Sequence, residues 1–260
     1  MMSSFLRRIL SAANYNRIWT CSIPFREYTI GVPSFDRWLC VKLHKIGLMG
    51  RDDLAFFQRH IKPGMTVIDI GANLGMYSLE LARLVGEAGR VYAFEPAPLL
   101  YRVAARNIQQ NGRERIVRLE NLALGSKTGT AVLHLGAINS GNNFLGAPSR
   151  HSGGVRVPVA RLDDVLPNLK VDWVKIDVEG WEIEALRGMP EMLRRNPSIC
   201  LYFEFCAANL RQAGEDPATL IEMFQKNGFS IFLPDGRVPE LARLLRRRGY
   251  FNLVARRNGH

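Results

Sequence analysis

The chain has 260 residues, of which 47% are hydrophobic and 23% are charged, and its formal net charge is +11 at pH 7. This apolar content excludes a disordered chain, and 23 Gly and 13 Pro exclude a collagen-like one. The positive charge leaves nucleic acid, an anionic membrane surface and acidic ligands open as partners, because net charge governs association rather than fold.

The distribution of charge along the chain reduces the range of possible partners. Residues 63–200 carry sixteen basic and fourteen acidic side chains, so the excess lies toward the two ends of the chain. A nucleic-acid enzyme would place its basic stripe beside the catalytic centre, whereas basic ends suit peripheral contact with an anionic membrane. The four cysteines show no CxxC spacing, and no apolar run approaches 18 residues. We therefore expect a cytoplasmic protein that contacts a membrane peripherally if at all.

The predicted elements fall into two parts. Helical fragments at 35–46 and 53–60 predict an N-terminal helical extension over residues 1–60. From residue 61 to 260, short β-branched apolar runs alternate with helical segments, which predicts one α/β domain with a mostly parallel sheet and helices on both faces. The predicted strands are 65–70, 90–94, 116–119, 172–177, 199–205, 229–233 and 250–255. Because the last two are close in sequence, an antiparallel edge strand is expected.

One interruption breaks this alternation. Two further predicted strands, 130–135 and 155–159, flank a polar loop at 136–154. A loop of this length inside a compact domain is usually functional or disordered. We take it as a candidate acceptor-binding segment.

The most informative motif is the run Asp69-Ile-Gly71-Ala-Asn73-Leu-Gly75, at the end of the first predicted strand of the domain. Open α/β sheets bind ligands at this edge, and the two glycines would let a ligand approach the backbone, while Asn73 is expected to cap the following helix. The G-x-x-x-G spacing differs from the G-x-G-x-x-G of nicotinamide enzymes. Tyr77 on that helix is expected to be half core and half cofactor wall.

Two carboxylates indicate which nucleotide-like ligand the motif binds. Glu95 ends the next strand, where it can accept hydrogen bonds from both hydroxyls of an adenosine ribose. Asp69 beneath the loop would repel phosphate but tolerate a ligand with a sulfonium and an α-amino group. S-adenosylmethionine has both features, so we expect it as the cofactor.

Four segments together resemble the FkbM-type family of S-adenosylmethionine-dependent methyltransferases. They are DIGANLGMYSLELA from residue 69, FEP from 94, NLALG from 121 and VKIDVEGWEIEALRGM from 174. The resemblance covers about residues 60–235 and implies a seven-stranded, Rossmann-like class I methyltransferase fold. It also implies O-methylation of hydroxyls on sugars, glycans, glycolipids or polyketide-like products. It places Gly71, Asn73 and Gly75 at the methionine part of the cofactor, Glu95 at the ribose and Asn121 near the adenine. Segments 1–60 and 136–154 match no motif, so acceptor specificity is expected there.

The catalytic candidates are carboxylates that follow two central strands. A hydroxyl is a poor nucleophile and benefits from a general base. Asp177 at the end of strand 172–177 is our first candidate and Glu179 the second, although both could instead cap a helix over 179–187. Glu204 ends the apolar run 199–205 and is expected to face the cleft. His151 is a further candidate base, and Trp181 is expected to belong to the core.

Three alternatives remain. Asp177 with Glu204 could bind a divalent metal, but no third ligand is evident, so no metal site is predicted. An RNA ribose 2′-O-methyltransferase would share these two acids within a Lys-Asp-Lys-Glu arrangement, but the second lysine is absent between them. A binding module without catalysis would keep the fold while its cofactor residues decayed, and none has decayed. The expected acceptor is therefore a small-molecule or glycan hydroxyl rather than nucleic acid.

Overall fold

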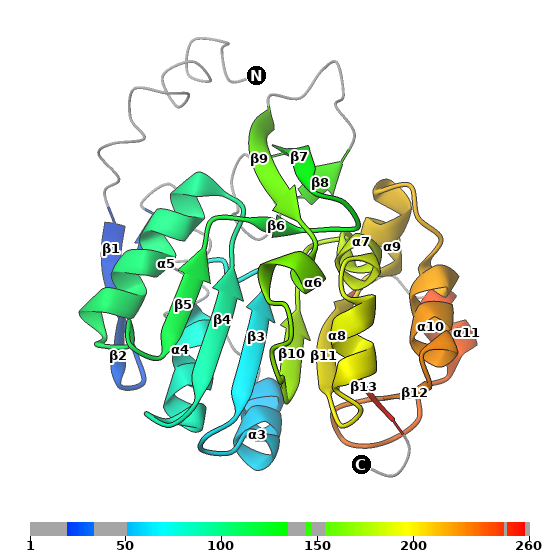
Figure 1. The fold of residues 1–260 in the computed structure, drawn as a ribbon, viewed down its shortest axis with the longest axis horizontal. Helices are drawn as coiled ribbons and strands as arrows, with labels where there is room; N and C mark the ends of the chain where they lie inside the picture. The colour runs from blue at the N-terminus through cyan, green and yellow to red at the C-terminus, as the bar shows by residue number, and fades with distance from the viewer. Residues whose placement is uncertain (1–19, 34–50, 135–143, 147–153, 247–248, 258–260) are drawn as a thin grey trace.

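The computed structural model describes residues 20–33, 51–134, 144–146, 154–246 and 249–257. Its centre is a seven-stranded sheet with the strand order β12-β13-β11-β10-β3-β4-β5 (Figure 1). The strands are β3 (Thr66–Ile70), β4 (Arg90–Phe94), β5 (Val117–Glu120), β10 (Trp173–Ile176), β11 (Cys200–Phe205), β12 (Phe229–Phe232) and β13 (Phe251–Arg257). Each predicted strand of the domain is confirmed to within two residues at either end.

Only β13 runs against the others, since it is antiparallel to both β11 and β12 while the remaining pairs that involve β10, β3, β4 and β5 are parallel. The prediction of an antiparallel edge strand is therefore wrong in position, because β13 is interior and β12 forms the edge. Three consecutive buried residues, Leu253, Val254 and Ala255, explain the interior place, since an interior strand is covered on both faces.

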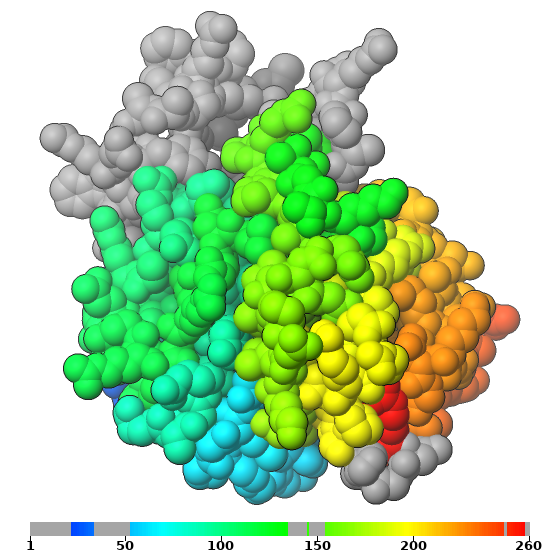
Figure 2. Space-filling view, viewed as in Figure 1, coloured from blue at the N-terminus to red at the C-terminus, as the bar shows by residue number. Residues whose placement is uncertain are grey.

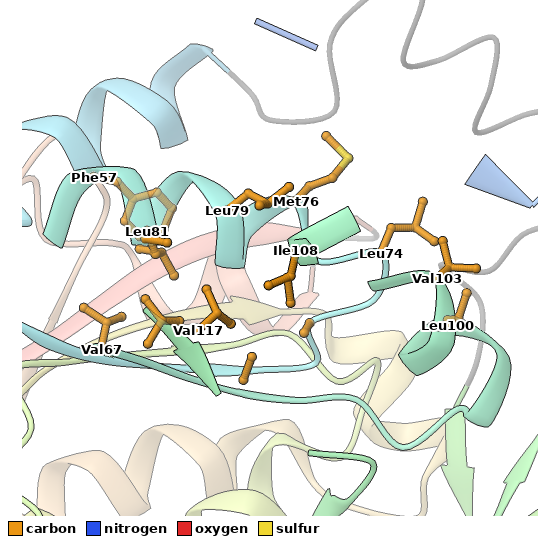
Figure 3. Packing of buried hydrophobic residues seen from close by; sticks show 14 of the residues in the cluster. Phe57, Val67, Leu74, Met76, Leu79, Leu81, Leu100, Val103, Ile108 and Val117 are labelled. Atoms are coloured by element: carbon orange, nitrogen blue, oxygen red, sulfur yellow. The ribbon is translucent and has the colours of Figure 1, made fainter. Parts of the chain in front are cut away.

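Helices cover both faces of the sheet, in the three-layer arrangement that the alternation of strands and helices predicts. Along β3, Val67 belongs to one buried cluster and Ile68 to the other, as the period of two in a strand requires. The first cluster includes residues of α3 (Arg51–His60), α4 (Met76–Val85) and α5 (Pro98–Gln110). Figure 3 shows Phe57 of α3 beside Leu81 of α4, with Val67 on the strand below them.

The second face carries the other helices of the described residues. They are α6 (Leu162–Val165), α7 (Glu182–Arg187), α8 (Pro190–Arg195), α9 (Ala207–Gln212), α10 (Pro217–Lys226) and α11 (Leu241–Arg246). Asp216 caps α10 by accepting a hydrogen bond from the backbone N–H of Ala218 at 3.0 Å, and Pro217 occupies the first helical position.

The N-terminal part contains a hairpin that the sequence analysis missed. Strands β1 (Thr20–Phe25) and β2 (Tyr28–Pro33) pair antiparallel, so the helical interpretation is wrong for these residues. Arg26 adopts a left-handed φ of 56° in the two-residue turn, and every second residue from Tyr28 to Val32 is buried against the first cluster. The predicted helix 53–60 is confirmed as α3, whereas 35–46 lies outside the described residues.

Asn107 of α5 fixes the hairpin to the domain. Its Oδ1 accepts a hydrogen bond from the backbone N–H of Gly31 at 2.7 Å, and its Nδ2 donates to the carbonyl oxygens of Gly31 and Leu74 at 3.1 and 2.8 Å. The amide is fully buried, so all of these bonds form away from water. The hairpin is thus packed on the helices of the first face.

A second sheet stands at the carboxyl ends of the parallel strands. Its order is β6 (Ala123–Leu124), β9 (Gly154–Ala160), β7 (Gly129–His134) and β8 (Phe144–Gly146). The predicted pair of extra strands is confirmed by the antiparallel pairing of β7 with β9. In Figure 1 the arrowheads of β3, β4 and β5 point toward this sheet, and Figure 2 shows its green atoms rising above the body of the domain. Most of loop 136–154 lies outside the described residues.

Among the described helices, none combines the length and the apolar character needed to cross a membrane. The basic segments at 1–19 and 247–248 fall outside the described residues, so contact between the basic ends and an anionic membrane stays a prediction.

Candidate active site

The polar residues of the site form two neighbouring rows on the first face of the sheet. Lys175 of β10 is the register partner of Asp69 on β3 and of Tyr202 on β11. Asp177 follows β10 directly and its N–H bonds the carbonyl of the last β3 residue, while Glu204 near the end of β11 is paired with Asn252 of β13. The topology therefore brings together residues from distant parts of the sequence, at the edge where parallel sheets bind ligands.

A buried ion pair lies in the row formed by Asp69, Lys175 and Tyr202. The Nζ of Lys175 is 3.1 Å from Oδ1 of Asp69 and 3.5 Å from Oδ2 of Asp177, and Ser78 Oγ donates to Oδ2 of Asp69 at 2.6 Å. Burial alone would lower the pKa of Lys175, but the charges of the two aspartates outweigh it and hold that pKa above its usual value. Asp69 is 0% exposed, so it can influence a ligand above the loop only through its charge.

The two glycines of the loop between β3 and α4 have structural roles in addition to the predicted one of letting a ligand approach the backbone. A Cβ on Gly71 (φ 84°) would lie 1.8 Å from the carbonyl oxygen of Asp177, so this glycine permits close packing of two strand ends. Gly75 (φ 79°) is the N-cap of α4, and no side chain caps that helix. The prediction that Asn73 caps the helix is therefore wrong. Asn73 instead adopts a left-handed φ of 52° inside the loop.

Glu95 is held firmly at the end of β4. Its Oε2 accepts from the backbone N–H of Asn73 at 2.7 Å and its Oε1 from that of Ala97 at 2.8 Å. Burial raises the pKa of Glu95 to about 7, although both backbone bonds act in the opposite direction. Asn121 donates its amide hydrogens to the carbonyl oxygens of Glu95 and Pro96 at 2.8 and 3.0 Å. Asn121 thus fixes the backbone that presents Glu95.

Three carboxylates converge next to the row of Asp69, Lys175 and Tyr202. Oxygens of Asp177, Glu179 and Glu204 all lie within 4.8 Å of one another. The sequence showed no third oxygen ligand beside Asp177 and Glu204, and that statement is wrong, because Glu179 supplies one. Glu179 reaches this place through a left-handed φ of 51°, and its Oε2 accepts a hydrogen bond from Asn209 at 2.7 Å. Hard divalent cations prefer oxygen ligands of this kind, so the three side chains could hold one.

Glu182 organises the turn that carries these acids. Helix α7 begins at Glu182 rather than at the predicted residue 179, because Glu179 and Gly180 both have positive φ angles. The Glu182 side chain is buried, and its Oε1 accepts from the N–H of Gly180 at 3.1 Å. Burial raises the pKa of Glu182 to about 7. No role for Glu182 could be predicted from the sequence, since an acid in a first helical turn is ordinary.

The acids differ in their expected protonation. Burial, followed by the charges of Asp177, Glu179 and Glu182, raises the pKa of Glu204 from its usual 4.5 to about 9. Glu204 therefore holds a proton at neutral pH and can donate a hydrogen bond. Asp177 is a third exposed, and its Oδ2 lies 3.5 Å from the Nζ of Lys175. Asp177 is thus the better placed acceptor of a proton.

A stability measurement tests this assignment. Between pH 4.5 and 9 the folded protein keeps the Glu204 proton and the unfolded chain loses it, so the unfolding free energy falls as pH rises. We expect Glu204→Gln to flatten this fall by up to about 1.4 kcal/mol per pH unit in urea unfolding at pH 6, 7.5 and 9. Glu222→Gln, an exposed control, should keep the wild-type slope, and an equal slope in Glu204→Gln would contradict the assignment.

Trp181 and Tyr77 were also singled out in the sequence, and both contact residues of the core or of the site. The indole N–H of Trp181 donates to the carbonyl of Leu124 at 3.0 Å, and its ring packs against the first cluster, in line with the expected core role. Tyr77 is half-buried, with the Nζ of Lys175 4.6 Å from its ring centroid. His151 lies outside the described residues. Asp53 of α3, which the sequence did not single out, accepts a hydrogen bond from the hydroxyl of Tyr77 at 3.3 Å.

Known proteins resemble this chain along most of the domain. A family model described as the methyltransferase FkbM domain matches residues 69–231. The chain is 32% identical over 157 residues to methyltransferase sdnD of Sordaria araneosa, an alignment that covers 48% of this chain and 60% of that protein. It is 27% identical over 216 residues to methyltransferase 1 of Beauveria bassiana, covering 74% of this chain and 81% of that protein.

Solved structures resemble the chain more distantly. The crystal structure of methyltransferase FkbM from Methylobacillus flagellatus KT has a TM-score of 0.49 at 13% sequence identity, covering 86% of this chain and 55% of that one. SMU.1697c from Streptococcus mutans, solved in complex with SAH, has a TM-score of 0.46 at 11% identity and covers 80% of this chain and 98% of that one.

Proposed function

The chain belongs to the FkbM methyltransferase family, and from this membership we propose that it methylates a hydroxyl oxygen of an uncharged sugar, glycan, glycolipid or polyketide-like small molecule. Its cofactor is S-adenosylmethionine. The observation that carries the proposal is the cluster of Asp177, Glu179 and Glu204 at the carboxyl ends of β10 and β11.

The residues at the end of β3 and β4 fit this cofactor. Both carboxylate oxygens of Glu95 are oriented by backbone N–H groups, and each retains a lone pair for a ribose hydroxyl. The loop from Gly71 to Gly75 would hold the methionine part, above the buried pair of Asp69 and Lys175. When bound, the cofactor supplies an electrophilic methyl group on a sulfonium.

The chain's own contribution is to orient the acceptor and to take up its proton. Asp177 is a third exposed and held by Lys175, so its carboxylate can accept the hydroxyl proton that methylation releases. Because Glu204 is protonated, its side chain can donate a hydrogen bond to an oxygen atom of the methyl acceptor. Glu179, fixed by Asn209, is the second candidate for the base.

The charge of the site supports an uncharged acceptor over the RNA alternative. Three carboxylate side chains converge at the reaction edge, and the nearest lysine is already paired with Asp69 and Asp177. Even with Glu204 protonated, acidic side chains at this edge disfavour the phosphates of an RNA backbone, whose binding depends on lysine and arginine contacts. A neutral hydroxyl compound meets no such barrier.

Labelling identifies the acceptor class directly. The protein is incubated with methyl-labelled S-adenosylmethionine and fractionated host extract, and the labelled compound is identified by mass spectrometry. We expect an O-methyl group on an uncharged small molecule or glycan, with equal labelling after ribonuclease treatment of the extract. Label on a nitrogen atom, or label that ribonuclease removes, would contradict the proposal.

A further inference from the structure

Helix α3 precedes the family-matched segment, yet it places a carboxylate beside the site. Asp53 accepts hydrogen bonds from three side chains. They are the hydroxyl of Tyr77 at 3.3 Å, the hydroxyl of Tyr202 and the amide of Asn252 at 2.9 Å. These donors belong to α4, β11 and β13, so one residue joins α3 to three separate elements.

Both tyrosines remain hydrogen-bond donors under all physiological conditions. Burial, followed by the charge of Asp53, raises the pKa of Tyr77 and that of Tyr202 well above the usual value. A carboxylate that accepts charge-assisted bonds from neutral hydroxyls forms stronger bonds than a neutral acceptor would. Asp53 thus fixes the orientation of both rings.

Aromatic packing holds α3 in the position that this network needs. The ring of Phe57 lies 4.7 Å from that of Tyr202 and 5.9 Å from that of Tyr77, and the ring of Phe56 lies 5.2 Å from that of Tyr202. Phe56 and Phe57 are both buried. The helix is therefore docked on the same two tyrosines that Asp53 binds.

Each donor adjoins a residue of the active site. Tyr77 packs on the ammonium of Lys175 and lies two residues after Gly75, the last residue of the cofactor loop. Tyr202 is the register partner of Lys175, and Asn252 is the register partner of Glu204. A change at Asp53 would consequently reach both the cofactor loop and the acidic cluster.

We propose that Asp53 is a positioning residue for the cofactor site, which acts by holding Tyr77, Tyr202 and Asn252 in place. The N-terminal segment is then a working part of the site, although no family motif extends to it. This inference rests on the proposed function, because it assumes that the ligand above the loop is the methyl donor.

The test is a double-mutant cycle in the affinity for S-adenosylhomocysteine, measured by calorimetry on the full chain. We expect Asp53→Ala to weaken binding about tenfold, the equivalent of one charge-assisted hydrogen bond. Tyr77→Phe should weaken binding less, and the double variant should bind no more weakly than Asp53→Ala, because Asp53 acts through Tyr77. If Asp53→Ala does not fold, Asp53→Asn should show a loss of about threefold and the same coupling.

The matched control is Asp163→Ala. Asp163 is a buried carboxylate that likewise accepts three hydrogen bonds, from the N–H groups of Glu191 and Met192 and from Arg161, but it fixes α8 to α6. It should lower the melting temperature without changing affinity. Wild-type affinity in both Asp53 variants, effects that multiply in the double variant, or an equal loss in Asp163→Ala would overturn the inference. Absence of binding to the wild type would instead overturn the proposed function.

Discussion

Asp177→Asn is expected to lower turnover by about 10² to 10⁴, the usual contribution of a general base. Asparagine keeps the size of the side chain but cannot take up the hydroxyl proton. The affinity for S-adenosylhomocysteine should stay within about threefold of wild type, because the proposed cofactor contacts are made by other residues. Initial rates with labelled donor at saturating acceptor, together with calorimetry, measure both quantities.

Glu179→Gln is the matched comparison, since Glu179 belongs to the same cluster but is already held by Asn209. It should lower turnover less than Asp177→Asn. Turnover that survives in Asp177→Asn and collapses in Glu179→Gln would transfer the role of base to Glu179.

Lys175→Met should cost about 3–5 kcal/mol of unfolding free energy. The lysine is 3% exposed and Asp69 is 0% exposed, so removal of the ammonium leaves a buried carboxylate whose remaining side-chain hydrogen-bond partner, among the described residues, is Ser78. An uncompensated buried charge is among the largest single-residue penalties known. Urea unfolding at pH 7 measures the loss.

Two variants separate this cause from loss of packing. Lys226→Met removes an exposed ion pair with Glu222 and should change the unfolding free energy by less than about 0.5 kcal/mol. Asp69→Leu combined with Lys175→Met removes both charges and should recover most of the stability. A double variant as unstable as Lys175→Met alone would show that the unpaired charge is not the cause.

Sequence patterns predicted the parallel sheet well because its central strands β3 and β10 are short, mostly apolar runs that both faces of the sheet bury. Val67 and Ile68 illustrate this. They face opposite sides of the sheet and both are buried, so the strand is a continuous apolar run without alternation of apolar and polar residues. The hairpin at Thr20–Pro33 was harder, because Pro24 and the turn at Arg26 interrupt a short alternation. Neighbouring helical fragments then dominated the interpretation of that segment.

Prediction of the site from the sequence was limited by local backbone conformation and by contacts between distant residues. The sequence placed Asp177 and Glu204 at the same edge of the sheet, because the carboxyl ends of adjacent parallel strands must meet, and the two side chains do lie close together. Their catalytic role stays a prediction. The local conformation was not predictable, since a left-handed Glu179 is uncommon for a residue with a side chain and creates the third member of the cluster. Asp53 could not be found at all, because its partners lie up to 199 residues away in the sequence.

The central claim is that the loop at residues 71–75 and Glu95 form the binding site for S-adenosylmethionine. Calorimetric titration with S-adenosylhomocysteine tests it most directly. The wild type should bind one molecule with micromolar affinity, and Glu95→Ala should weaken that affinity about 10- to 100-fold because a charge-assisted ribose contact is lost. Absence of binding to the wild type at high micromolar ligand, or unchanged affinity in Glu95→Ala, would contradict it.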